Sequence, residues 1–173
     1  MLVRCTTGDP MAFRAFVVRY QRPVFALLSR LLGAGPHVED LAQEAFLRAF
    51  RAFPTFDVDA RAKPSTWILT IATRLALDAR KARKLATVPI DAAYDAPAAA
   101  TPATEHARGE LGRSIARAAA ELPDDQRAAF ILAELHGFSM AEIAAALDIA
   151  ENTVKTRLHR ARMKLQQFLK EAP

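Results

Sequence analysis

The sequence predicts an all-α protein built from two small helical domains that are joined by an extended linker. Apolar residues recur every three or four positions over most of the chain, which is the spacing of helices with one buried side. Hydrophobic residues make up 51% of the chain, and many of them are alanines, which favour helices. Residues 85–105 differ, because they are rich in Ala and Pro, are acidic and show no periodicity. We therefore expect domains at residues 9–84 and 106–170, with the linker at 85–105.

Four helices are expected in the first domain. Asp9 followed by Pro10 is typical of an N-cap with proline at the first helical position. Pro23 is expected to restart the chain as a second helix, because an internal proline removes a helical hydrogen bond. Residues 54–64 should form an irregular connection. The expected helices cover about residues 10–22, 24–32, 38–52 and 65–83.

The second domain is expected to end in a helix-turn-helix. Ser139 and Glu142 form the S-x-x-E pattern of a capping box, so a helix should begin there. Asp148 then falls where the turn needs a residue that tolerates the left-handed backbone region. The expected helices cover about residues 106–120, 124–135, 139–147 and 151–170.

The last of these helices separates an apolar side from a basic side. Val154, Leu158, Ala161 and Leu165 follow at spacings of four, three and four, which places them together. A helix that buries one side and offers hydrogen-bond donors on the other suits the major groove of DNA. The alternative to DNA binding is a surface helical hairpin whose Lys and Arg side chains are simply solvated. The opposite side and its flanks carry Asn152, Lys155, Thr156, Arg157, His159, Arg160, Met163 and Lys164.

The charge of the chain favours polyanionic partners. The formal net charge is +5 and the pI about 9.8. Residues 1–84 hold 14 Lys and Arg against 7 Asp and Glu, whereas the linker holds three acids and no base. Residues 151–165 contain five bases and one acid, so the positive charge of the second domain gathers on its last helix.

Several classes of protein are excluded or disfavoured by composition. A single cysteine, Cys5, rules out a disulfide framework and fits a reducing compartment; we expect it at a mobile terminus. The four histidines show no ligand spacing, so neither a metal nor another cofactor is expected. No apolar run reaches the ~20 residues that span a bilayer, and residues 1–9 lack the apolar region of a signal peptide. The chain is expected to be cytoplasmic and not inserted in a membrane.

Two helices of the first domain carry candidate binding residues. Asp40, Gln43 and Glu44 lie at helical neighbour spacing and can project together, although a solvated helix side is the simpler interpretation. The fourth helix, which Ser65 or Thr66 can cap, carries small hydroxyl groups and a basic edge that suit phosphates and unstacked bases. Lys and Arg at the C-terminal end of this helix also interact favourably with the helix dipole, which leaves a purely structural interpretation open. The side opposite its buried stripe carries Thr66, Thr70, Thr73, Arg74, Leu77, Asp78 and Lys81, with Arg61, Lys63 and Lys84 at its ends.

Three aromatic residues beside the fourth helix could stack on bases or close the domain core. They are Phe53, Phe56 and Trp67. Core packing is the favoured interpretation, because aromatic residues near the start of a helix usually close a core.

Five motifs in order resemble the extracytoplasmic-function (ECF) sigma factors, the two-domain type of sigma-70 family initiation factor. The match covers about residues 9–169, nearly the whole chain. Each motif is moderately specific alone, and their common order and separation make the resemblance strong. The motifs are Asp40-Leu-Ala-Gln-Glu-Ala-Phe46, Trp67-Ile-Leu-Thr-Ile-Ala-Thr73, Leu122-Pro123-x-x-Gln126-Arg127, Ser139-x-x-Glu142-Ile143-Ala144 and Val154-Lys-Thr-Arg-Leu-His-Arg-Ala-Arg162.

The resemblance implies a role for each candidate surface. Residues 9–84 would be a sigma-2 domain, with Asp40, Gln43 and Glu44 docking on the clamp helices of the largest polymerase subunit. The connection and the fourth helix would hold the minus-10 element as single-stranded DNA, and the linker would thread the polymerase channel. Residues 106–170 would be a sigma-4 domain that reads the minus-35 element. The minus-10 set would be Arg61, Lys63, Ser65, Thr70, Arg74, Lys81 and Lys84, and the minus-35 set Asn152, Lys155, Thr156, Arg157, His159, Arg160, Arg162 and Lys164.

The resemblance also implies partners. They are core RNA polymerase, through the clamp helices and the flap of the second-largest subunit, promoter DNA and commonly a separate anti-sigma factor. A fused C-terminal sensor domain is not expected after the last helix. Arg74 departs from the Asn that many relatives carry, which affects the minus-10 preference, and Asp148 replaces a frequent Gly.

Two other functions compete with an initiation factor. A stand-alone helix-turn-helix regulator accounts for residues 138–165 but leaves the basic edge of the first domain and the acidic linker unexplained. A small enzyme would need a nucleophile with a base, a metal cluster or a phosphate-binding loop, and none can be assembled from this sequence. We therefore expect a promoter-specificity factor that is not an enzyme.

Overall fold

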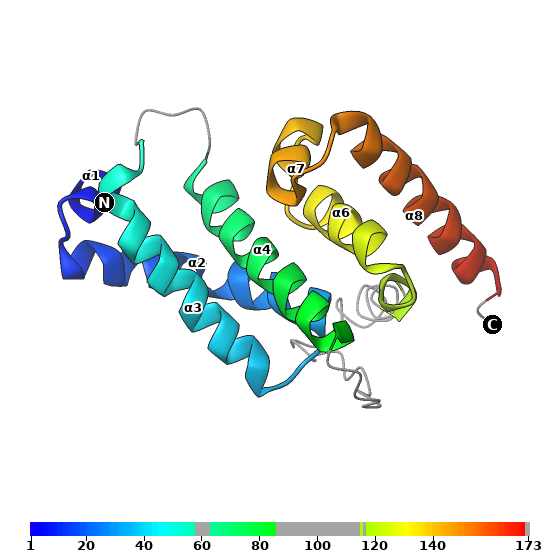
Figure 1. The fold of residues 1–173 in the computed structure, drawn as a ribbon, viewed down its shortest axis with the longest axis horizontal. Helices are drawn as coiled ribbons and strands as arrows, with labels where there is room; N and C mark the ends of the chain where they lie inside the picture. The colour runs from blue at the N-terminus through cyan, green and yellow to red at the C-terminus, as the bar shows by residue number, and fades with distance from the viewer. Residues whose placement is uncertain (58–62, 86–114, 116, 172–173) are drawn as a thin grey trace, which may run out of the picture. The chain divides into compact units, whose positions relative to one another are not determined.

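The computed structural model describes residues 1–57, 63–85, 115 and 117–171, and every regular element in that part of the chain is a helix (Figure 1). The prediction of an all-α fold is confirmed. Of the helix expected at 106–120, residues 115 and 117–120 are helical; the rest of it, and residues 86–105 of the linker, lie outside the described residues. The elements are α1 (Leu2–Thr6), α2 (Pro10–Leu32), α3 (Pro36–Ala52), the 3-10 turn η1 (Phe53–Thr55), α4 (Pro64–Leu85), α6 (Asp124–Glu134), α7 (Met140–Leu147) and α8 (Glu151–Glu171).

The chain divides into two compact units. The first contains α1, α3, α4 and most of α2, and the second contains α6, α7 and α8. In the first unit α3 packs on α4, while α1 and α3 both contact η1. In the second unit α6 and α7 both pack on α8 and on each other. Each unit therefore builds its own small core.

The start of α2 has the cap that the sequence predicts. The backbone N–H groups of Met11 and Ala12 donate to Asp9 Oδ1 at 2.8 and 3.2 Å. Arg4 Nε donates to the other carboxylate oxygen of Asp9 at 2.6 Å. The hydrogen bonds from Ala12 and Met11, together with Arg4, hold the pKa of this carboxyl below its usual value. The cap thus satisfies two backbone donors that a helix start would otherwise leave unpaired.

The expected break at Pro23 is wrong, because α2 runs unbroken from Pro10 to Leu32 with Pro23 inside it. An internal proline costs about 3 kcal/mol in a helix. Phe16, Val24 and Leu27 stay in helical phase on both sides of Pro23, and all three are fully buried. Tertiary burial of one continuous apolar side therefore outweighs the local cost.

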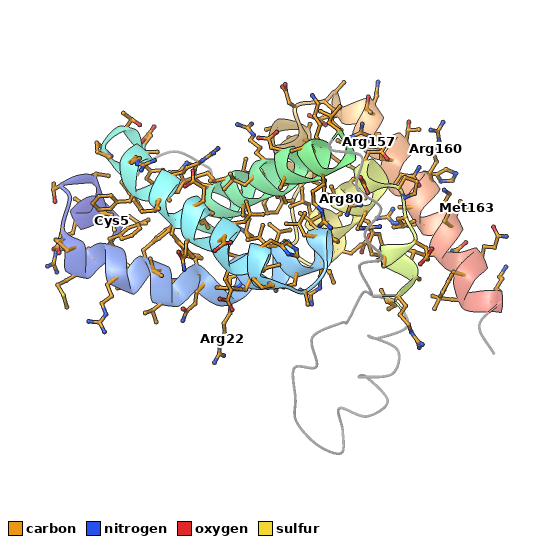
Figure 2. All side chains as sticks on the ribbon, turned by 60° about the horizontal axis from the view of Figure 1, so that its bottom comes forward. Cys5, Arg22, Arg80, Arg157, Arg160 and Met163 are labelled. Atoms are coloured by element: carbon orange, nitrogen blue, oxygen red, sulfur yellow. The ribbon has the colours of Figure 1, made fainter. Side chains whose placement is uncertain are left out.

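The N-terminus is ordered, contrary to the expectation of a mobile segment. Cys5 lies in α1 with only 3% of its surface exposed (Figure 2). This burial raises the pKa of its thiol. Cys5 is therefore a small core residue, and its thiol is not positioned for chemistry.

An aromatic cluster joins α2, α3, η1 and α4. Phe53 lies at its centre, with 1% of its surface exposed. Its ring centroid is 5.0 Å from that of Phe16 and 5.0 Å from that of Trp67. Trp67 also packs at 4.5 Å on Phe56, which follows η1 directly. Core packing is confirmed for Phe53, and the half-buried Phe56 and Trp67 pack against it.

The helix-turn-helix of the second unit forms as the sequence predicts. The backbone N–H of Glu142 donates to Ser139 Oγ at 3.2 Å, and the backbone N–H of Ser139 donates to Glu142 Oε2 at 2.8 Å. Both halves of the capping box are therefore present. Asp148 ends α7 with φ 54° and ψ 52°, and among the described residues it alone of the non-glycines has a positive φ. Its left-handed backbone lets the N–H of Ile149 reach Ala144 O at 3.0 Å.

Substitution of Asp148 tests this turn. Asp148→Gly is expected to raise the free energy of unfolding by up to about 1 kcal/mol, because glycine adopts the left-handed region without the Cβ clash. Asp148→Val should lower it by about 1–2 kcal/mol, because a β-branched side chain is strained there. Chemical denaturation followed by circular dichroism measures both changes. Equal stability of the two variants would contradict a left-handed turn at this position.

Candidate polymerase and nucleic-acid interfaces

The outer side of α3 carries the acidic and amide groups of the candidate polymerase surface. Asp40 and Gln43 are exposed, whereas Glu44 is half-buried and accepts a hydrogen bond from Arg48 Nε at 2.7 Å. Leu47 lies four residues after Gln43, so it shares their side of the helix, and it is 50% exposed. Leu47 is not among the residues expected from the sequence, although its spacing from Asp40 and Gln43 places it beside them. The patch therefore combines polar groups with one exposed apolar side chain.

One side of α4 gathers most of the candidate minus-10 residues. Thr70, Arg74 and Lys81 follow at spacings of four and seven residues, which places them on the same side. Arg74 and Lys81 are exposed, and Lys63 is exposed just before the helix. The hydroxyl of Thr70 donates to Thr66 O at 2.7 Å, so its oxygen keeps acceptor capacity. Ser65 is half-buried, while Arg61 and the side chain of Lys84 lie outside the described residues.

Two threonines that were expected on the outer side of α4 are buried instead. Thr66 is 9% exposed and Thr73 is fully buried. The hydroxyl of Thr73 donates to Leu69 O at 2.8 Å, so its burial leaves no donor unpaired. The buried arc of α4 is wide because the helix packs on α3 and, through Trp67, also on the aromatic cluster. Sequence periodicity identified only part of that arc.

The predicted buried side of α8 is confirmed. Val154 and Ala161 are fully buried, and Leu158 and Leu165 are nearly so. The side chains on the other side are all exposed, and Figure 2 shows Arg160 and Met163 along the outer edge of α8. Met163 adds an apolar group that is 55% exposed. The exposed polar members of the candidate set are Asn152, Lys155, Thr156, His159, Arg160, Arg162 and Lys164.

Two arginines at the flanks of α8 are paired with carboxylates of α6. Arg157 is half-buried, and its Nε lies 3.2 Å from Asp125 Oδ2. Arg162 donates to Glu134 Oε1 from both Nη2 at 2.7 Å and Nε at 3.2 Å. Both arginines belong to the expected minus-35 set, but the sequence pattern does not reveal their acidic partners, because these lie 28 and 32 residues away in the chain.

Arg127 of α6 organises the segment before its own helix. Its Nε donates to Ala119 O at 3.0 Å, and its Nη2 donates to Leu122 O at 3.0 Å and also to Ala120 O. Ala119 and Ala120 end the preceding helical turn at residues 117–120, and Leu122 lies two residues after it. A cation at the C-terminal end of a helix also complements the helix dipole. Arg127 therefore connects the incoming segment to α6, in addition to the burial of Ala118, Ala119 and Leu122.

The described residues 1–57, 63–85, 115 and 117–171 hold neither a candidate metal site nor a membrane-spanning helix. No group of three His, Cys, Asp or Glu residues there could hold a metal ion. None of the helices in those ranges is long and apolar enough to cross a membrane.

Comparisons with known proteins identify both units. Residues 16–85 match the family model of sigma-70 region 2, and residues 112–165 match that of sigma-70 region 4. The ECF RNA polymerase sigma factor SigW of Bacillus subtilis (strain 168) is 34% identical over 95% of this chain and 92% of its own length. The ECF RNA polymerase sigma-E factor of Escherichia coli (strain K12) is 35% identical over 94% of this chain and 88% of its own length.

Solved structures share the fold. CnrH, in complex with the cytosolic domain of CnrY, superposes with a TM-score of 0.68 at 25% identity over 99% of this chain and 96% of that chain. The sigma factor RpoE of Bartonella quintana, in complex with the anti-sigma factor NepR, gives a TM-score of 0.70 at 24% identity over 94% of this chain and 99% of that chain.

The chain belongs to the ECF sigma factors of the sigma-70 family. It is therefore a transcription initiation factor that directs RNA polymerase to promoters, and the stand-alone regulator is not favoured.

Replacement of Arg127 tests its organising role. Arg127→Lys is expected to lower the free energy of unfolding by about 2 kcal/mol, because an ammonium group cannot reach three carbonyls that a planar guanidinium spans. Arg117→Lys is the matched control, since Arg117 is exposed on the preceding helical turn, and it should change stability by less than about 0.5 kcal/mol. Denaturation of the full chain measures both free energies of unfolding. A loss for Arg127→Lys as small as that of the control would show that Arg127 is dispensable.

Proposed function

We propose that this sigma factor divides its binding functions between two domains at residues 9–84 and 106–170, joined by the linker at 85–105. The first domain binds core RNA polymerase and the minus-10 element, and the second binds the minus-35 element. The observation that carries the proposal is the separation of α8, whose apolar side is buried and whose basic side is open. A domain stabilised on one side of its last helix can present the other side to the major groove.

For core polymerase, we assign the exposed side of α3. Asp40 and Gln43 are open to solvent, and Glu44 is held beside them by Arg48. They dock on the clamp helices of the largest subunit, and the exposed Leu47 adds an apolar contact at the C-terminal end of the same patch. An interface that combines a buried apolar contact with surrounding polar groups is typical of specific association. The second domain contacts the flap of the second-largest subunit.

For the minus-10 element, we assign the open side of α4 and the connection before it. Cationic groups there would follow the phosphates of a separated strand, and hydroxyl groups would hydrogen-bond to bases. Trp67 is half-buried and packs on Phe53 and Phe56, which favours core packing over base stacking for its ring. Arg74, where many relatives carry Asn, would alter the base preference. The assigned residues are Arg61, Lys63, Ser65, Thr70, Arg74, Lys81 and Lys84.

For the minus-35 element, we assign the open side of α8. Lys155, Thr156, His159 and Arg160 lie where a recognition helix contacts base edges, and Asn152 lies at its first turn. Arg157, Arg162 and Lys164 lie at the flanks, where phosphates of the groove walls would pass. The exposed Met163 would contact a thymine methyl group.

We further propose that the protein acts in the cytoplasm, without catalytic activity of its own and without a cofactor. A separate anti-sigma factor, as is common in this family, would restrain it. In the solved structure of CnrH the bound partner is the cytosolic domain of CnrY, which supports a partner of this kind.

Reconstituted transcription is the decisive experiment for the function. Purified chain is added to core polymerase that lacks any sigma factor, together with duplex DNA from upstream of its own gene. Discrete start sites that depend on the chain are expected, and Gln43→Ala should reduce them by weakening the association with core polymerase. Arg14→Ala, on the exposed side of α2, is the control. Absence of both transcripts and core binding, with a footprint by the chain alone, would instead indicate a stand-alone regulator.

Two substitutions on α8 separate base reading from phosphate contact. Arg160→Ala is expected to relax selectivity at one minus-35 base pair, at a cost of about 1–3 kcal/mol on the preferred sequence. Lys164→Ala should weaken binding about equally on all sequences and lower the salt dependence by about one released ion. Binding of the reconstituted holoenzyme to promoter variants at several salt concentrations measures both. An equal loss on every variant for Arg160→Ala would remove it from the base-reading set.

A further inference from the structure

The flanks of α8 are each connected to one end of α6 by an ion pair. Asp125 lies in the first turn of α6 and pairs with Arg157, and Glu134 is the last residue of α6 and pairs with Arg162. The buried residues Leu158 and Ala161 lie between the two arginines along α8. The two pairs therefore lie on opposite sides of the buried stripe and at opposite ends of α6.

Glu134 occupies a position that helix electrostatics disfavours. The C-terminal end of a helix carries partial negative charge, so an acidic residue there is destabilising unless a cation compensates it. Arg162 supplies that cation through two hydrogen bonds to the same oxygen, at 2.7 and 3.2 Å. The pair is 57% and 40% exposed, so its own contribution to stability is small. Its position therefore calls for a reason other than helix stability.

Each paired guanidinium keeps donors for a second anion. A guanidinium has five N–H donors in a fixed plane. Asp125 lies against Nε of Arg157, and Glu134 engages Nε and Nη2 of Arg162, so other N–H groups of both arginines can still bind a phosphate. An arginine already fixed in one rotamer loses less conformational entropy when it binds DNA.

We propose that Asp125 and Glu134 are positioning residues for promoter recognition. This proposal rests on the proposed contact of α8 with duplex DNA. Each carboxylate holds one flanking arginine of α8, and each guanidinium is then shared between that carboxylate and a DNA phosphate. The two shared arginines set the rotation of α8 in the major groove, because they lie on opposite flanks of the helix. The acidic residues thus aid the binding of a polyanion.

The sign of one substitution tests the proposal. Simple electrostatics predicts that removal of an acidic residue near DNA tightens binding. Glu134→Ala is instead expected to weaken promoter binding by the holoenzyme about two- to fivefold, the range of an exposed ion pair, and Asp125→Ala to do the same. Glu121→Gln is the matched control, because Glu121 is an exposed acid of the same unit that forms no ion pair with the described residues. It should leave binding unchanged or slightly tighter.

The measurement uses the full chain with core polymerase and one promoter duplex, selected by the wild-type holoenzyme from a pool with a random upstream region. Binding is measured over a range of salt concentrations. Glu134→Ala should lower the salt dependence by up to about one released ion, as Arg162→Ala should, because the same phosphate contact is lost. Circular dichroism of each variant shows that the helices remain, and removal of an acid from the end of α6 does not weaken that helix.

An exchange of charges between Glu134 and Arg162 distinguishes the positioning of Arg162 for a phosphate from a contact that only joins α6 to α8. The double variant Glu134→Arg with Arg162→Glu restores the ion pair but places a carboxylate on α8. Sharing with a phosphate predicts that promoter binding stays weak, whereas full recovery would overturn the proposal. Tighter binding by Glu134→Ala, while Arg162→Ala weakens it, would also overturn the proposal and leave the DNA contact of α8 intact. If Arg160→Ala and Arg162→Ala both left binding unchanged, the proposed minus-35 contact itself would fail.

Discussion

Burial of one side of α8 against α6 and α7 is the constraint on which the DNA-binding half of the molecule depends. Val154, Leu158, Ala161 and Leu165 leave water together, and this burial determines which side of α8 remains open. The capping box at Ser139 begins α7, and the left-handed turn at Asp148 ends it before α8. The polar groups proposed to read bases can then be exposed without cost to the core, because none of them contributes to it.

The first unit is held together by aromatic packing. Aromatic rings from α2, α3, η1 and α4 meet around Phe53, and edge-to-face contacts such as that between Phe53 and Trp67 hold their relative orientation. The cluster lies at both ends of the connection that leads into α4. The outer sides of α3 and α4 keep exposed polar residues, among them Asp40, Gln43 and Arg74, and these are the surfaces proposed for polymerase and for DNA.

Positive charge alone does not describe the nucleic-acid surface. The chain has a net charge of +5, yet two of the five bases on residues 151–165 are paired with carboxylates. Such pairing reduces non-specific attraction to DNA, and it fixes the direction in which the paired groups can bind. A promoter factor needs discrimination among many competing sequences, so a smaller and more directed set of cations suits it better than a uniformly basic surface.

The sequence by itself determined the helical class, the helix-turn-helix with its cap and left-handed turn, and the buried stripe of α8, because these depend on local spacing and on residues a few positions apart. Only the tertiary structure decided four other features. They are the continuity of α2 through Pro23, the burial of Cys5, the burial of Thr66 and Thr73 on α4, and the pairing of Arg157 and Arg162 with α6. Each of these depends on contacts between segments distant in the chain. Periodicity shows that a helix has a buried side, but how wide that side is, and which flanking charge meets a partner, depends on the surfaces that pack against it.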